Sequence, residues 1–142
     1  MSPAFALLRR VHFHETDMAG VMYFANYFRL MEEVEQAFFR SLGFAVALDL
    51  SGTRTGFPRV NVQCEYFEPA RFDEELSLEL HVTRLGAKSM TYEVDFVRAG
   101  KRIARGRITG VCCIADGGGI RSIPIPAEIV GKLRPFVRER NE

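Results

Sequence analysis

An acidic segment that contains a glycine and precedes a helical pattern holds the residues best able to do chemistry in this chain. Asp17 and Gly20 lie in this segment, and the helical pattern begins at about Asn26. The first N–H groups of a helix have no partner within the helix, and the helix dipole makes that end positive. A carboxylate beside such donors could hydrolyse an activated acyl group, because the donors would bind the developing oxyanion.

The helix that must position this segment is predicted from Asn26 to Leu42, with Gly43 as its stop. Apolar residues recur at three- and four-residue steps, which is typical of an amphipathic helix. These residues are Tyr27, Leu30, Met31, Val34, Ala37, Phe38 and Leu42. Charged and polar residues, Glu35 among them, fill the other positions. Asn26 is expected at the N-cap, where its side chain would accept a helix N–H.

Most of the remaining chain alternates apolar and polar residues, which indicates half-buried strands. Such strands are predicted at 60–66, 76–83 and 91–96, and a more continuously apolar one runs from Arg102 to Ala115. A first strand is expected at 5–13, with Val11 and Phe13 on one face. Residues 51–56 look like a loop, and a final helix is expected at 127–138, interrupted near Pro135. The layout is α+β in one domain, residues 1–142, with a curved antiparallel sheet wrapped around the long helix.

Composition excludes several classes of protein. A formal net charge of +1 gives no bulk attraction to nucleic acid or to a membrane surface, and neither is expected as a partner. No apolar run approaches the roughly 20 residues of a membrane span, and we expect a cytoplasmic protein. The three cysteines, Cys64, Cys112 and Cys113, form neither a disulfide framework nor a zinc motif, and buried thiols are the favoured interpretation. His12 and His14 lack a third ligand at suitable spacing, so no metal and no cofactor is predicted.

The segment from Asp17 to Tyr27 resembles the motif of hotdog-fold acyl-CoA thioesterases. The 4-hydroxybenzoyl-CoA and 1,4-dihydroxy-2-naphthoyl-CoA thioesterase types are the most similar. Three further stretches, 56–58, 84–89 and 121–126, match in the same order, so the resemblance covers nearly the whole chain. It implies a hotdog fold, a homodimer with two sites at the subunit interface, and a homotetramer of paired dimers.

The resemblance also implies roles for individual residues. Asp17 corresponds to the catalytic carboxylate, as nucleophile or as general base, and the backbone N–H of Phe24 would face the thioester oxygen. Asp17 could instead only cap a turn, where aspartate is common. Glu33 is a reserve carboxylate, because another hotdog branch uses a helix glutamate; a solvated or interface-paired glutamate is its alternative. The substrate- and coenzyme-binding residues would be Gly20, Tyr23, Asn26, Tyr27, Phe57, Pro58, Lys88, Ser89 and Arg121.

The implied activity is hydrolysis of an acyl-CoA to a carboxylate and free coenzyme A, and an aromatic acyl group is favoured. A short- or medium-chain aliphatic acyl group is the enzymatic alternative. A different class is a non-catalytic protein that binds acyl-CoA or acyl-carrier protein, which would not need Asp17. A hotdog hydratase would need a histidine at the helix, and none occurs between His14 and His81.

Overall fold

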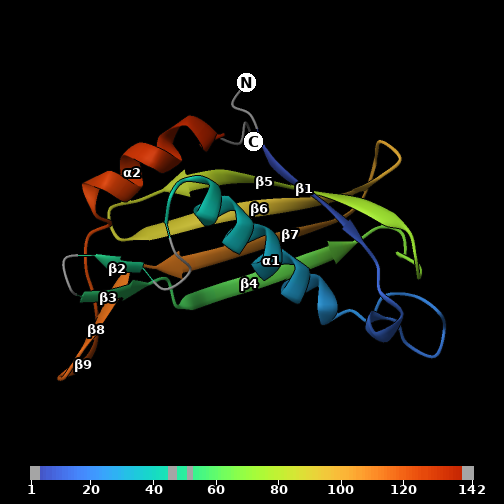
Figure 1. Cartoon of the computed structure of the whole chain (residues 1–142), viewed down its shortest axis with the longest axis horizontal. Coiled ribbons are helices and arrows are strands. Elements are labelled where there is room, and N and C mark those ends of the chain that lie inside the picture. Colours follow the sequence, from blue (N-terminus) through green and yellow to red (C-terminus); the bar gives the residue numbers. More distant parts are fainter. Residues whose placement is uncertain (1–3, 45–47, 51–52, 139–142) are drawn as a thin grey trace.

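The computed structural model describes residues 4–44, 48–50 and 53–138, and its main feature is a five-stranded antiparallel sheet. The strand order is β1-β5-β6-β7-β4, so β1 and β4 form the two edges. The strands are β1 (Phe5–Arg10), β5 (Glu75–Leu85), β6 (Ser89–Arg98), β7 (Lys101–Val111) and β4 (Arg59–Tyr66). The long helix α1 (Asn26–Ser41) lies across one face of this sheet (Figure 1). The predicted α+β layout is therefore confirmed.

The hydrophobic core forms where α1 meets the central strands. The inward residues of β5 and β6 are all buried, as their alternation predicted: Leu76, Leu78, Leu80, Val82, Tyr92, Val94 and Phe96. On β7 the facing position is Gly106, and a Cβ there would overlap the Sδ of Met31. The missing side chain therefore lets the middle of α1 approach the sheet closely.

The edge strand β4 does not follow the predicted half-buried pattern. Val60 is 63% exposed, and Val62 and Tyr66 are also exposed. The alternation is present, but the apolar residues of an edge strand stay open where no other element of the same chain covers them. Glu35, which was expected on the polar side of α1, is instead buried and forms an ion pair with Arg59, so this pair joins the helix to β4.

The predicted first and fifth strands end earlier than expected. β1 stops at Arg10, and a 3-10 turn, η1 (Phe13–Glu15), follows; Val11 is buried whereas Phe13 is 74% exposed, so they do not share a face. The strand predicted from Arg102 to Ala115 divides at Cys112, whose N–H donates to the Lys88 carbonyl oxygen. The chain then enters a second sheet of order β2-β3-β8-β9.

The second sheet is small and lies at one end of the main sheet (Figure 1). Its strands are β2 (Leu48–Leu50), β3 (Thr53–Gly56), β8 (Cys113–Asp116) and β9 (Gly119–Ser122). β3 replaces most of the loop predicted at 51–56, of which residues 51–52 lie outside the described residues. The final helix α2 (Ala127–Leu133) gives way to the 3-10 turn η2 (Arg134–Phe136), so the predicted interruption near Pro135 is confirmed. The helix does not continue to Arg138 as predicted, because Val137 is extended and bridges Val82 on β5. No helix in the described part of the chain is long and apolar enough to cross a membrane.

The contact between Gly106 and Met31 gives a first prediction. Gly106→Ala should lower the free energy of unfolding by about 1–3 kcal/mol, because the new methyl group must displace a fully buried side chain. Gly131→Ala in α2 is the matched control: a Cβ there meets nothing, and alanine should add roughly 0.5–1 kcal/mol. Urea denaturation of both variants measures the difference. Equal midpoints for the two variants would contradict the close approach of α1 and β7.

Candidate active site

Residues 15–21, called the Asp17 segment below, include a tight turn with an exposed carboxylate. Asp17 N–H donates to the Val21 carbonyl oxygen at 2.9 Å, and the Asp17 Oδ1 accepts the N–H of Ala19 at 2.8 Å. Gly20 has φ +79°, a left-handed conformation that glycine adopts without a steric penalty. Oδ2 accepts no hydrogen bond from the described residues. One oxygen of Asp17 therefore caps the turn, and the other remains open to a ligand.

Asn26 joins this segment to the helix in a way that differs from the prediction. The N-cap residue is Ala25, and Asn26 is the first residue of α1. The Asn26 side chain is buried and donates to the Glu15 carbonyl oxygen at 2.8 Å, while its Oδ1 accepts from Arg29 at 2.9 Å. The N-cap prediction was wrong because the amide reaches back to the preceding loop instead of to the helix N–H groups.

The backbone of Phe24 lies at the positive end of α1. Its N–H donates no hydrogen bond within the residues that the structure describes, whereas its carbonyl oxygen accepts the Tyr66 hydroxyl at 3.1 Å. The Phe24 side chain is 58% exposed and lies against the ring of Tyr23, with 4.8 Å between ring centroids. The Phe24 N–H thus has the properties of an oxyanion donor.

A pocket of about 290 Å³ adjoins this helix end. It is lined by Val21, Met22, Phe24, Tyr27, Tyr66, Phe67, Glu68 and Pro69. The ring of Tyr27 is buried and meets that of Tyr66 edge to face, with 4.8 Å between centroids. Burial raises the pKa of Tyr27. Although the Tyr66 side chain is partly exposed, local desolvation of its hydroxyl and the neighbouring Cys64 raise its pKa, so both phenols carry their proton at neutral pH and Tyr66 acts as a hydrogen-bond donor. Half of the lining residues are aromatic, and Glu68 adds one carboxylate to the lining.

An ion-paired cluster behind the Asp17 segment was not predicted from the sequence. Arg9 on β1 donates to both carboxylate oxygens of Glu15, at 2.8 and 2.5 Å. Arg9 Nε also donates to Glu33 on α1 at 2.8 Å. Burial opposes ionisation of Glu15, but the hydrogen bonds from Arg9 and the His12 N–H outweigh it, and the pKa of Glu15 lies below its usual range. The acidic character of residues 14–17 was the signal in the sequence for this cluster. Nothing in the sequence indicated that the partner would be an arginine on β1.

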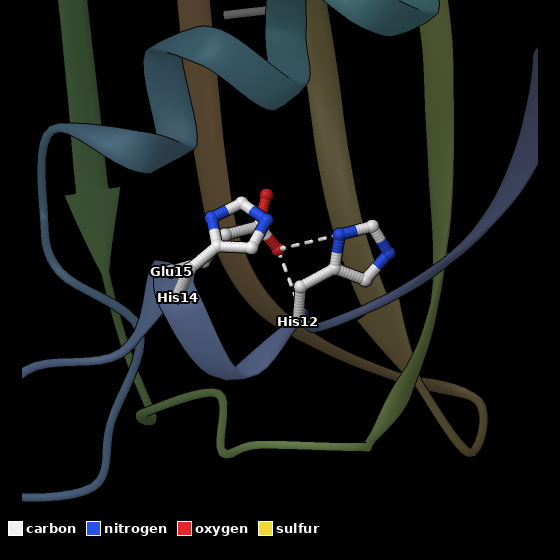
Figure 2. A group of neighbouring side chains, drawn as sticks. All are labelled: His12, His14 and Glu15. Carbon is white, nitrogen blue, oxygen red and sulfur yellow. Dashed lines mark hydrogen bonds and ion pairs between the residues drawn. The ribbon is translucent and has the colours of Figure 1, made fainter.

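This cluster also bears on two earlier expectations. Glu33 is paired with Arg9 within the same chain, which leaves it less suited than Asp17 to act as the carboxylate. Figure 2 shows the side chains of His12 and His14 close to the Glu15 carboxylate, and one ligand atom from each lies within 4.8 Å of the others. Among the described residues this is the group that could hold a metal ion. Because the Glu15 oxygens already accept from Arg9 and from the His12 N–H, a metal would have to compete with these donors.

The residues expected to bind the coenzyme lie at the other end of the molecule. The turn that carries Lys88 bonds to the C-terminal segment, since Ile125 N–H donates to the Ala87 carbonyl oxygen at 2.9 Å. Ser89 begins β6, whereas Phe96, seven residues on, contacts Tyr27 beside the pocket. Because seven residues of strand span roughly 23 Å, Ser89 lies about that far along β6 from the pocket. Figure 1 likewise places the turn 86–88 and β8–β9 at the end opposite to residues 12–25.

Phe57, Pro58 and Arg121 also lie away from Asp17. The ring of Phe57 stacks on Phe39, with 6.2 Å between centroids, and Phe39 lies about 20 Å along α1 from Asn26. Pro58 lines a second pocket of about 260 Å³, together with residues of β3, β8 and β9. The guanidinium of Arg121 is exposed and lies 3.8 Å from Asp116. One chain therefore assembles Asp17, Gly20, Tyr23, Phe24, Asn26 and Tyr27 and leaves the other predicted ligands at a distance.

The cysteines do not offer a competing nucleophile at this site. All three are free thiols, and Cys112 is buried as predicted, whereas Cys64 and Cys113 are half-buried. Burial raises the pKa of Cys64 and of Cys112 to about 11, so both remain protonated at neutral pH.

Comparison with known proteins agrees with the fold. The family model of the thioesterase-like superfamily matches residues 11–133. A protein of Aquifex aeolicus that carries the name "Putative esterase" is 31% identical over 130 residues, covering 92% of this chain and 98% of that protein. A 1,4-dihydroxy-2-naphthoyl-CoA hydrolase of Trichodesmium erythraeum is 27% identical over 113 residues, covering 78% and 82%. The solved structure of gentisyl-coenzyme A thioesterase BH1999 superposes with a TM-score of 0.77 at 27% identity, covering 91% and 98%.

This chain belongs to the thioesterase-like superfamily. Its fold is the hotdog fold, in which a curved antiparallel sheet wraps a central helix, and its enzymatic class is thioester hydrolysis.

The hydrogen bond from Tyr66 to Phe24 gives a second prediction. Tyr66→Phe removes a donor that holds the Phe24 peptide, and the loss of one such bond, about 0.5–1.5 kcal/mol, should slow thioester hydrolysis roughly two- to tenfold. Release of free thiol measures the rate, and thermal unfolding reports whether the variant keeps its fold. An unchanged rate in a folded variant would show that the Phe24 peptide is held without this hydroxyl.

Proposed function

We propose that this protein is an acyl-CoA thioesterase in which Asp17 supplies the carboxylate chemistry. The observation that carries the proposal is the combination of an exposed carboxylate oxygen on Asp17 with an unengaged Phe24 N–H at the start of α1. These groups are the two that thioester hydrolysis requires. The pocket is lined by Phe24 and by Val21, whose carbonyl oxygen accepts the Asp17 N–H. A protein that only bound acyl-CoA would have no use for such a carboxylate.

Two routes use the same groups. As a general base, Asp17 takes a proton from water while the water oxygen bonds to the carbonyl carbon; the C–S bond then breaks and the proton passes to the coenzyme A thiolate. As a nucleophile, a carboxylate oxygen of Asp17 attacks the carbonyl carbon, coenzyme A leaves as thiolate, and water hydrolyses the mixed anhydride. In both routes the Phe24 N–H and the positive end of α1 stabilise the oxyanion.

An aromatic acyl group is the substrate class that the pocket favours. Tyr27, Tyr66 and Phe67 present ring edges and faces in a space of about 290 Å³, which suits one or two aromatic rings. The relatives named as hydrolases of 1,4-dihydroxy-2-naphthoyl-CoA and gentisyl-coenzyme A act on substrates of this class. The reaction is therefore hydrolysis of an aryl-CoA to an aryl carboxylate and coenzyme A.

We further propose that each complete site is built from two chains of a homodimer. The open edge of β4 carries exposed Val60 and Val62, a surface that a second copy could cover. Because Lys88, Ser89 and Arg121 lie far from Asp17 in their own chain, an antiparallel partner could bring its own set to the Asp17 pocket. Arginine and lysine there would bind the coenzyme phosphates.

The remaining expectations stay predictions. A homotetramer of two such dimers is expected, and light scattering would measure it. A cytoplasmic location is supported by the three free thiols, which reducing conditions maintain.

Replacement of the Asp17 carboxylate tests the chemistry directly. Asp17→Asn keeps an oxygen that can cap the turn but loses the charge, so kcat for aryl-CoA hydrolysis should fall about 100-fold or more. Thiol release across aryl, short, medium and long acyl-CoAs measures activity and substrate class together. Asp116→Asn is the matched control, because Asp116 Oδ1 caps a similar turn by accepting the Gly118 N–H at 2.9 Å. Full activity of Asp17→Asn would exclude Asp17 as the catalytic carboxylate.

Mixing two defective variants tests the shared site. Asp17→Asn lacks the carboxylate, and Lys88→Ala/Arg121→Ala should raise the KM for acyl-CoA. If each site takes one set of residues from each chain, mixed dimers regain one intact site, and random reassortment should restore about a quarter of wild-type activity. The mixture is assayed after co-refolding, beside each variant alone. Activity no higher than the mean of the two variants would place each site within one chain.

A further inference from the structure

We propose that Glu15 is the positioning residue of the thioester site: by its side chain and its carbonyl oxygen it holds Asp17 and the Phe24 peptide in register. This inference deepens the proposed function and rests on it. Glu15 lies two residues before Asp17. Its carbonyl oxygen accepts hydrogen bonds from Tyr23 and Asn26, which lie before and after Phe24 in the sequence.

The side chain of Glu15 anchors the segment to the main sheet. Glu15 is only 6% exposed, and its two oxygens accept two hydrogen bonds from Arg9 and one from the His12 N–H at 2.8 Å. A bidentate arginine–carboxylate pair fixes orientation as well as distance. Arg9 also donates to Glu33 at 2.8 and 3.0 Å, so a single guanidinium joins β1, the Asp17 segment and α1.

The carbonyl oxygen of Glu15 anchors the start of the helix. It accepts the Tyr23 N–H at 2.9 Å and the Asn26 side-chain amide at 2.8 Å. Tyr23 and Asn26 flank Phe24 in the sequence, so the direction of the Phe24 N–H depends on where this carbonyl lies. A shift of Glu15 would therefore move the carboxylate of Asp17 and the oxyanion donor relative to each other.

The same contacts exclude Glu15 from the chemistry itself. Its carboxylate is buried and fully engaged by Arg9 and His12, whereas the carboxylate of Asp17 is exposed. Glu15 acts through Asp17 and Phe24, and a displacement of about 1 Å in such a site can cost up to roughly 100-fold in rate.

The test compares Glu15→Gln with Glu74→Gln. Glu74 is a matched control, because its Oε1 likewise accepts one arginine, Arg98 at 2.8 Å, and the N–H three residues before it, Arg71 at 2.7 Å. Glu15→Gln should lower kcat for aryl-CoA hydrolysis roughly 10- to 100-fold with KM within twofold, because Lys88, Ser89 and Arg121, which are expected to bind the coenzyme, lie far from Glu15 while the reacting groups lose register. Glu74→Gln should change kcat less than threefold. Equal kcat in wild type and folded Glu15→Gln would overturn the proposal.

A double variant separates positioning from a general loss of stability. If Glu15 acts through Asp17, Glu15→Gln/Asp17→Asn should lose less than the product of the two single losses. A fully multiplicative loss would overturn the proposal. Should Glu15→Gln fail to fold, Arg9→Lys keeps the charge but not the paired geometry, and it should lower kcat with KM unchanged. A wild-type kcat in Arg9→Lys would equally overturn the proposal that Glu15 positions the site.

Amide hydrogen exchange tests the same inference without a measurement of activity. The Tyr23 amide should exchange at least tenfold faster in Glu15→Gln, whereas amides of β5 and β6 should keep their protection. If wild-type protein hydrolyses no acyl-CoA, the proposed function fails, and the exchange of Tyr23 still reports on Glu15. Unchanged exchange of Tyr23 in Glu15→Gln would show that Glu15 does not hold the helix start.

Discussion

The ion pair between Arg9 and Glu15 is the interaction on which the site depends most directly. A turn that exposes a carboxylate has few apolar contacts of its own, so its position must come from neighbouring elements. Arg9 provides that position from a strand in the main sheet, and the Glu15 carbonyl passes it on to α1. Burial of this pair is tolerable because each carboxylate oxygen has a donor, and removal of one partner would leave an unpaired charge in a poorly solvated place.

The second constraint is the way in which α1 covers the sheet. Gly106 allows the helix to lie close over the central strands, and the inward residues of β5 and β6 are buried as a result. The helix is too narrow to cover β4 as well, so Val60 and Val62 remain exposed at the edge. The element that makes the core compact therefore also leaves a strand edge that is suited to pairing with a second copy.

Several features could be predicted because they follow from local patterns. The period of the apolar residues in 26–42 determined a helix with one buried face, and the alternation in 76–83 and 91–96 determined strands. Asp17 and Gly20 identified a turn before the helix, because turn formation depends on residues a few positions apart. The strand ends at Arg10 and Val111 were missed, since both depend on hydrogen bonds to distant segments. The Asn26 side chain was misassigned for the same reason: its partner, the Glu15 carbonyl, competes with the helix N–H groups only once the chain has folded.

By itself the sequence determined the α+β layout and the position of the turn at residues 17–20, because these rest on residue types and short spacings; its resemblance to a known family predicted the class of chemistry. Only the tertiary structure decided which groups hold the residues on either side of that turn: Arg9 on β1 pairs with Glu15 and with Glu33 on α1, and Tyr66 on β4 donates to Phe24. It also decided that Phe57, Pro58, Lys88, Ser89 and Arg121 lie far from Asp17 within one chain. Distance between segments is set by the packing of helix and sheet, and no local pattern of residues encodes it.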